Sequence, residues 1–164
     1  KREAKDRAMK MLEAVRIRNP EQVYKLYPHE VSGGMGQRIM IAMMLIPEPS
    51  LLIADEPTSA LDVTVQLQVL AILDDLVTDR GMGLIFISHD LELVSSFCDR
   101  IIIMYGGRIM EIVKASDLHK SEHPYTRGLL NCLPKITGNK ERLPTLVREE
   151  SWLHPDSPHF QAGS

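Results

Sequence analysis

LLIADEPTSALD, residues 51–62, joins an uninterrupted apolar run to a cluster of acidic and turn-forming residues. A short apolar run without alternation is typical of a strand buried on both faces, so we expect a strand over residues 51–54. Asp55 and Glu56 follow it directly. Because ligands of open α/β sheets bind at the carboxyl ends of the strands, the stretch predicts a buried strand that delivers two carboxylates to a ligand-binding edge.

The sequence downstream repeats this design. Apolar residues at helical spacing predict a helix over residues 63–77. GLIFISHD, residues 83–90, then contains a second expected strand over residues 84–87, which stops at a polar cluster with His89 at its centre. Strands that alternate with helices argue for an α/β layer with a largely parallel sheet.

Another helix is expected over residues 91–97, before two strand-like runs joined by Gly106 and Gly107. The glycine pair predicts a β-hairpin, because tight hairpin turns need backbone conformations that glycine adopts readily. We expect this antiparallel hairpin to lie at the edge of the parallel sheet. The last stretch, residues 148–164, is polar and contains proline, and we expect it to be loosely ordered.

Two more helices are expected before the first strand: an amphipathic helix over residues 1–17, ended near Asn19 and Pro20, and another over residues 32–46. The second opens with VSGGMGQR, in which Ser32 fits an N-cap. Glycines at a helix start let bare backbone N–H groups approach a phosphate. By itself this pattern fits an ordinary cap and turn equally well, and only the acidic strand end that follows favours phosphate binding.

The two acids can have different roles, because side chains alternate along extended backbone. One can hold magnesium, directly or through water, and the other can orient or deprotonate an attacking water. The alternative is a strand that simply runs out into a polar loop. For His89 the alternative is a hydrogen-bonded loop residue, whereas beside the first strand its imidazole could touch a terminal phosphate.

Composition excludes several classes of protein. A net charge of −3 and a pI near 6.1 give no electrostatic argument for binding nucleic acid. No apolar run approaches the roughly 18 residues that a membrane-spanning helix needs, and the first residues do not resemble a signal peptide, so we expect a soluble, cytoplasmic chain. Cys98 and Cys132 belong to no metal-binding pattern and are expected to be reduced thiols.

Four motifs, VSGGMGQR, LLIADEP, SALD and ISHD, together resemble the second half of an ABC-type nucleotide-binding domain. More narrowly, LYPHEVSGGM, IADEPTSALDVTVQ, MYGGRIMEI and HPYTRGLL with Pro134 resemble the ATPase subunits of bacterial dipeptide, oligopeptide and nickel importers. The resemblance implies the carboxyl-terminal part of a RecA-like α/β domain. It would comprise part of the helical subdomain (residues 1–48), the second half of the ATPase core (49–115) and a small irregular extension (116–164).

The resemblance also implies roles for residues at matching positions. A cradle for the γ-phosphate of ATP held on a second protomer would be formed by Ser32, Gly33, Gly34 and Gln37. Asp55 would help to hold Mg²⁺, and Glu56 would polarise the hydrolytic water. Asp62 would cross the dimer interface, and His89 would contact the γ-phosphate.

The partners implied are a second ATPase subunit, identical or paralogous, transmembrane permease subunits and, indirectly, a substrate-binding protein, with no nucleic acid. The protein would lie peripherally on the cytoplasmic face of the bacterial inner membrane. A non-transport ABC ATPase, such as a DNA-repair or translation factor, and a non-catalytic interaction module are the alternatives.

The chain departs from the family pattern in three ways. No G-x-x-x-x-G-K-[ST] phosphate loop occurs in it, so we expect a carboxyl-terminal piece that alone binds ATP poorly, hydrolyses it negligibly and exposes a sheet edge for self-association. Gly36 stands where relatives usually carry a long polar residue, at a cost of about 1 kcal/mol relative to alanine. Only Cys132 follows the hairpin, so no iron–sulfur centre is expected.

Overall fold

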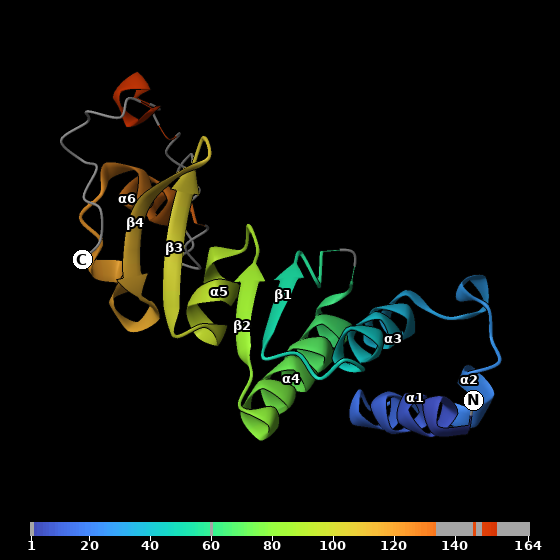
Figure 1. The fold of residues 1–164 in the computed structure, drawn as a ribbon. Coiled ribbons are helices and arrows are strands. Elements are labelled where there is room, and N and C mark those ends of the chain that lie inside the picture. The colour runs from blue at the N-terminus through green and yellow to red at the C-terminus, as the bar shows by residue number, and fades with distance from the viewer. Residues whose placement is uncertain (1, 60, 134–145, 147–148, 154–164) are drawn as a thin grey trace. The chain divides into compact units, whose positions relative to one another are not determined.

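The computed structural model describes residues 2–59, 61–133, 146 and 149–153. The chain divides into two compact units, Lys1–His89 and Asp90–Ser164, both visible in Figure 1. Pro134 and residues 154–164 lie outside the described residues. The three-part division at residues 48 and 115 stays a prediction.

The first unit combines helices with a parallel pair of strands. Its helices are α1 (Arg2–Ala14), α2 (Pro20–Val23), α3 (Gly33–Leu45) and α4 (Val63–Arg80), with a 3-10 turn η1 (Pro28–Glu30). Its strands are β1 (Leu51–Asp55) and β2 (Gly83–Ile87). They pair in parallel from Leu51 opposite Gly83 to Asp55 opposite Ile87, with α4 as the crossover between them (Figure 1). The predicted α/β pattern is confirmed.

The ends of these helices follow local rules. Ser32 caps α3 by accepting the Met35 N–H, as predicted. The first helix ends earlier than expected, at Ala14 instead of near Asn19, because Arg16 adopts a left-handed conformation with φ 56°. The Ile17 N–H then bonds to the Leu12 carbonyl at 2.9 Å, which closes the helix in a Schellman motif.

The core of the first unit lies among its helices. Side chains with at most 1% of their surface exposed come from the end of α1, from α3 and from α4, and they are Val15, Leu45, Val69, Ile72 and Leu73. The N-terminus of α3 lies beside the N-terminus of α4, where Gly34 packs against Val65. Both ends carry predicted site residues.

The prediction that the first strand is buried on both faces is wrong for this structure. Leu52 is only 8% exposed, but Leu51 and Ile53 on the opposite face are 50% and 62% exposed. Ile85 and Ile87 of β2 are also exposed. Because side chains alternate along a strand, a sheet covered on one side only leaves every second residue open to solvent.

The second unit contains the remaining elements. They are α5 (Leu91–Phe97), β3 (Arg100–Tyr105), β4 (Arg108–Lys114), η2 (Ala115–Lys120), α6 (Pro124–Asn131) and η3 (Glu150–Leu153). The hairpin is confirmed, with φ 55° at Gly106 and 78° at Gly107, as a tight turn of this hand requires. Among the described residues, β3 and β4 form a two-stranded sheet of their own, and the expected place of this hairpin at the edge of the parallel sheet stays a prediction.

Aromatic rings hold the second unit together around Trp152. This side chain is 2% exposed, and its ring lies 5.5 Å from Tyr125 and 6.0 Å from Tyr105. The expectation of a loosely ordered last stretch is therefore wrong at residues 149–153, where a large apolar side chain has surface to bury. In the described part of the chain, no helix combines the length and the apolarity that crossing a membrane requires.

Candidate functional site

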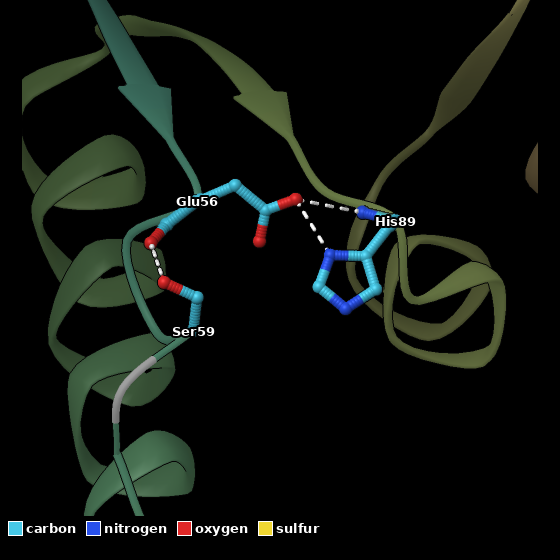
Figure 2. A network of polar contacts seen from close by, with 3 residues as sticks. All are labelled: Glu56, Ser59 and His89. Carbon is cyan, nitrogen blue, oxygen red and sulfur yellow. Dashed lines mark hydrogen bonds and ion pairs between the residues drawn. The ribbon is translucent and has the colours of Figure 1, made fainter.

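Glu56 and His89 meet at the carboxyl edge of the β1–β2 sheet (Figure 2). Since Asp55 lies opposite Ile87 in the parallel register, the residues that follow the two strands emerge side by side. Glu56 Oε1 accepts the His89 backbone N–H at 3.1 Å and lies 2.7 Å from His89 Nδ1. An ionised carboxylate can only accept, so this contact requires the proton of the ring on Nδ1.

The backbone of Glu56 is unusual. Its φ of 46° is left-handed, a conformation that costs a residue with a side chain about 1–2 kcal/mol. Two neighbours hold it there. The Glu56 N–H donates to the Ile87 carbonyl at 2.9 Å. The Glu56 carbonyl accepts the Ser59 hydroxyl at 3.2 Å, as Figure 2 shows. Strain of this kind is concentrated at functional sites, where the surrounding structure fixes it.

The backbone turn at Glu56 separates the two acids. Asp55 is the last residue of β1 and is exposed. With Gln37 of α3, it lines a small hollow of about 70 Å³ that also includes Met40 and Leu73. Gln37 and Asp55 thus face one space, whereas Glu56 is turned toward β2 and bonds to His89.

Asp55 offers one exposed carboxylate, and no cluster of three His, Cys, Asp or Glu side chains suited to a metal ion occurs among the described residues. This donor set fits magnesium better than a metal that needs a complete protein cage. Mg²⁺ is usually held by one or two carboxylates together with substrate phosphates and water.

The glycines at the start of α3 differ in their surroundings. A Cβ built on Gly33 would meet nothing within 4 Å, so its backbone is open to an incoming group. A Cβ on Gly34 would lie 2.4 Å from Val65 Cγ1, so this glycine allows α3 to pack closely on α4. Gly36 has room for a side chain, with Val31 Cγ2 at 3.9 Å.

Asp62 is the N-cap of α4 and accepts the Val65 N–H at 3.1 Å. It therefore shares Val65 with Gly34: the valine backbone is capped by the aspartate and the valine side chain covers the glycine. The structure thus groups the predicted residues as three pairs, Glu56 with His89, Gln37 with Asp55, and Gly34 with Asp62. Ser32 and Gly33 stand exposed at the tip of α3.

Sequence reasoning missed three residues that support these pairs. Ser59 binds the strained Glu56 carbonyl, Val65 packs on Gly34, and Arg38 donates to the Gly34 carbonyl at 3.2 Å. Ser59 bonds to the carbonyl three residues earlier, a local pattern that is common for serine. No local signal identifies the other two, because their roles depend on how α3 packs against its neighbours.

The chain is similar to known proteins over most of its described length. The family model for "ABC transporter" matches residues 1–59. A probable peptide ABC transporter ATP-binding protein of Sinorhizobium fredii is 51% identical over 146 residues, which are 88% of this chain and 44% of that protein. An oligopeptide transport ATP-binding protein of Salmonella typhimurium is 46% identical over 89% of this chain and 44% of its own length.

Solved structures give the same result. A component of an ABC transporter complex from Clostridium perfringens matches with a TM-score of 0.64 at 28% identity, over 72% of this chain and 46% of that one. A dimeric ATP-binding cassette in a post-hydrolysis state, bound to ADP and phosphate, matches with a TM-score of 0.61 at 28% identity, over 70% of this chain and 48% of that one. The chain therefore spans less than half the length of these relatives.

Proposed function

Because this chain belongs to the ABC transporter family, we propose that the complete protein is an ATP-binding subunit that hydrolyses ATP to power the import of peptides or a related small solute such as nickel. The observation that carries the proposal is the Glu56–His89 contact at the end of two parallel strands. The names of the relatives favour peptides as the transported class.

Glu56 is proposed to activate the hydrolytic water. The two hydrogen bonds drawn between Glu56 and His89 in Figure 2 both end on Oε1 and leave Oε2 outside this contact. Oε2 can therefore accept a hydrogen bond from an attacking water and remove its proton as the phosphoryl bond breaks. Transfer of a phosphoryl group depends mainly on positioning and charge stabilisation, so a carboxylate fixed by strain and by a neighbouring strand suits this role.

His89 is proposed to contact the γ-phosphate. When the Nδ1–H of the ring donates to Glu56, the other ring nitrogen, Nε2, lies on the opposite side of the ring. As imidazolium, it would donate to Glu56 and to a phosphate oxygen together. Asp55 would help to hold Mg²⁺, which supplies charge neutralisation at the phosphates when it is bound.

The start of α3 is proposed to bind the same phosphate from a second protomer. Ser32 and Gly33 are exposed, and Gly33 leaves the first turn of the helix open to an anion. Gly34 and Gln37 complete this cradle, and Asp62 would cross the interface. Dividing the donors between two protomers makes hydrolysis conditional on dimer closure.

The assembly implied is a dimer of ATPase subunits, identical or paralogous, bound to transmembrane permease subunits on the cytoplasmic face of the inner membrane. A substrate-binding protein would deliver the solute to the permease. These partners are proposed from the family, and binding of the complete protein to its co-expressed permease tests them.

The proposed catalytic role is tested in the complete protein with Glu56→Gln, which keeps the shape of the side chain. We expect steady-state ATP hydrolysis to fall about a hundredfold or more, because loss of a general base costs at least this much. Glu92→Gln changes an exposed acid on α5 and is the matched control, expected to hydrolyse ATP at the parental rate. Turnover of Glu56→Gln near the parental rate would contradict the assignment.

A further inference from the structure

Arg38 links the start of α3 to the end of α1. Its Nε donates to the Gly34 carbonyl at 3.2 Å, one turn earlier in the same helix. Its Nη1 donates to the Arg16 carbonyl at 3.3 Å, 22 residues away. A single planar guanidinium therefore bridges a carbonyl group of α3 and a carbonyl group just beyond α1, a geometry that its rigid fork of donors allows.

The Arg16 carbonyl is a suitable anchor. Arg16 ends α1 in a Schellman motif, so its backbone is fixed by the bond between Arg16 N and the Glu13 carbonyl at 2.9 Å. The C-terminal end of a helix also carries partial negative charge, which favours a cation there. The side chain of Arg16 bonds in turn to Asp75 on α4.

Gly34 is thereby held from two sides. Arg38 donates to the Gly34 carbonyl. Val65 of α4 lies so close to Gly34 that a Cβ on this glycine would overlap the valine side chain. The Val65 N–H is itself capped by Asp62. These contacts connect α1 to α3, α3 to α4 and α4 back to α1. They include Gly34 and Asp62, two residues of the proposed nucleotide interface.

We propose that Arg38 is a positioning residue, which fixes the first turn of α3 so that Ser32 and Gly33 face the phosphate of the opposite protomer correctly. The inference rests on the proposed function, because the phosphate is the ligand that this turn would meet. Arg38 itself is half-buried beneath the turn and need not touch ATP. A small displacement of a group that contacts the reacting atoms is enough to reduce catalysis strongly.

The experiment compares three variants of the complete protein. Arg38→Met keeps the aliphatic stem and removes the fork. Arg38→Lys keeps the charge but has a compact ammonium that lacks the fork for both carbonyls. Arg18→Met is the matched control, because Arg18 is exposed and lies close to the end of α1.

Two readouts are taken. Hydrogen exchange of the Gly36 amide, which bonds to the Ser32 carbonyl at 2.8 Å, reports on the first turn of α3 without any need for catalysis. Steady-state kinetics give kcat and KM for ATP. We expect faster exchange at Gly36 in Arg38→Met, with kcat lowered about tenfold or more and KM changed far less, because a misplaced turn affects the reacting complex. Arg38→Lys is expected to be intermediate and Arg18→Met parental.

Unchanged exchange at Gly36, or faster exchange with parental kcat, would overturn the inference. A loss of kcat matched by an equal rise in KM would also overturn it, since it would indicate general damage to nucleotide binding. If Arg38→Met does not fold, Arg38→Lys carries the same comparison. A parental protein without ATP turnover would contradict the proposed function itself, which separates that failure from a failure of the Arg38 inference.

Discussion

Glu56 Oε1 lies 2.7 Å from His89 Nδ1 and 3.1 Å from the backbone nitrogen of the same histidine. Two donors thus converge on one oxygen, across 33 positions of sequence. The parallel register of β1 and β2 causes this meeting, because it places the ends of both strands at one edge. The orientation of Glu56 therefore follows from the fold of the two strands.

Replacing His89 separates the two bonds. His89→Ala in the complete protein removes the side-chain donor and leaves the backbone N–H, so Glu56 stays partly oriented. We expect ATP turnover to fall about tenfold or more, since the group proposed to stabilise charge at the γ-phosphate is lost. The histidine side chain is 82% exposed, so stability should change little. His119→Ala is the control, because His119 is an exposed histidine of η2. Parental turnover in His89→Ala would contradict the proposed contact of His89 with the γ-phosphate.

The glycines of α3 should respond in opposite directions to alanine. Gly36→Ala is expected to raise the free energy of unfolding by about 0.5–1 kcal/mol, because the site has room and alanine favours a helix. Gly34→Ala should lower it by about 1–3 kcal/mol, because the new methyl group overlaps Val65. Urea denaturation measures both. Val65→Ala should restore part of the loss in the double variant, and equal stability of the two single variants would contradict the α3–α4 contact.

Asp62 has a structural role that must be separated from its proposed role at the interface. Asp62→Ala removes the cap of α4 and should lower the free energy of unfolding by about 1 kcal/mol. Asp62→Asn keeps a capping oxygen and should retain stability. ATP turnover of the complete protein that falls in both variants would support the interface role. If turnover falls only in Asp62→Ala, the variant that loses stability, then Asp62 acts only as the N-cap of α4.

Cys98 gives a pH-dependent signal in the second unit. Burial raises the pKa of its thiol, and the negative charge of Asp99 raises this pKa further. In the folded chain, alkylation should therefore reach its half-maximal rate at a higher pH than in the denatured chain, measured with Cys132→Ser so that Cys98 is the sole thiol. Asp99→Asn should lower the midpoint. Identical midpoints in folded and denatured chains would contradict the shift.

The same shift has a consequence for stability. Folding favours the neutral form of a thiol whose pKa is higher in the folded state. Below the unfolded pKa the thiol is neutral in both states, so its contribution to the free energy of unfolding does not change with pH there. This contribution is lost as the pH rises from the unfolded pKa through the folded one. The free energy of unfolding should therefore decrease more steeply at alkaline pH in the parental chain than in Cys98→Ala.

Most of the features that the sequence predicts correctly are determined by neighbouring residues. Ser32 as a cap depends on the first turn of α3, and the hairpin depends on Gly106 and Gly107. Glu56 and His89 meet because each follows an apolar strand, and the two strands end at the same edge of the sheet. Motif positions thus predicted which residues would gather at the sheet edge.

The features that were missed depend on packing between distant segments. Trp152 is buried against Tyr105 and Tyr125, and no local pattern distinguishes it from a tryptophan in a loose tail. The bridge from Arg38 to Arg16 requires knowledge of where α1 ends. The exposure of Ile53 likewise depends on what covers the sheet, and the residues of a strand cannot encode this.

The exposed face of the parallel pair leads to a prediction about association. This face carries apolar side chains that are each at least 45% exposed, and they are Leu51, Ile53, Ile85 and Ile87. Contiguous apolar surface beside open strand edges promotes pairing between molecules. We expect the 164-residue chain to self-associate with increasing concentration in sedimentation velocity.

Ile53→Lys should weaken association without unfolding the chain, because Ile53 is 62% exposed. Leu67→Lys, at an exposed site on α4, is the matched control, and a chain that stays monomeric at every concentration would show that this face does not drive association.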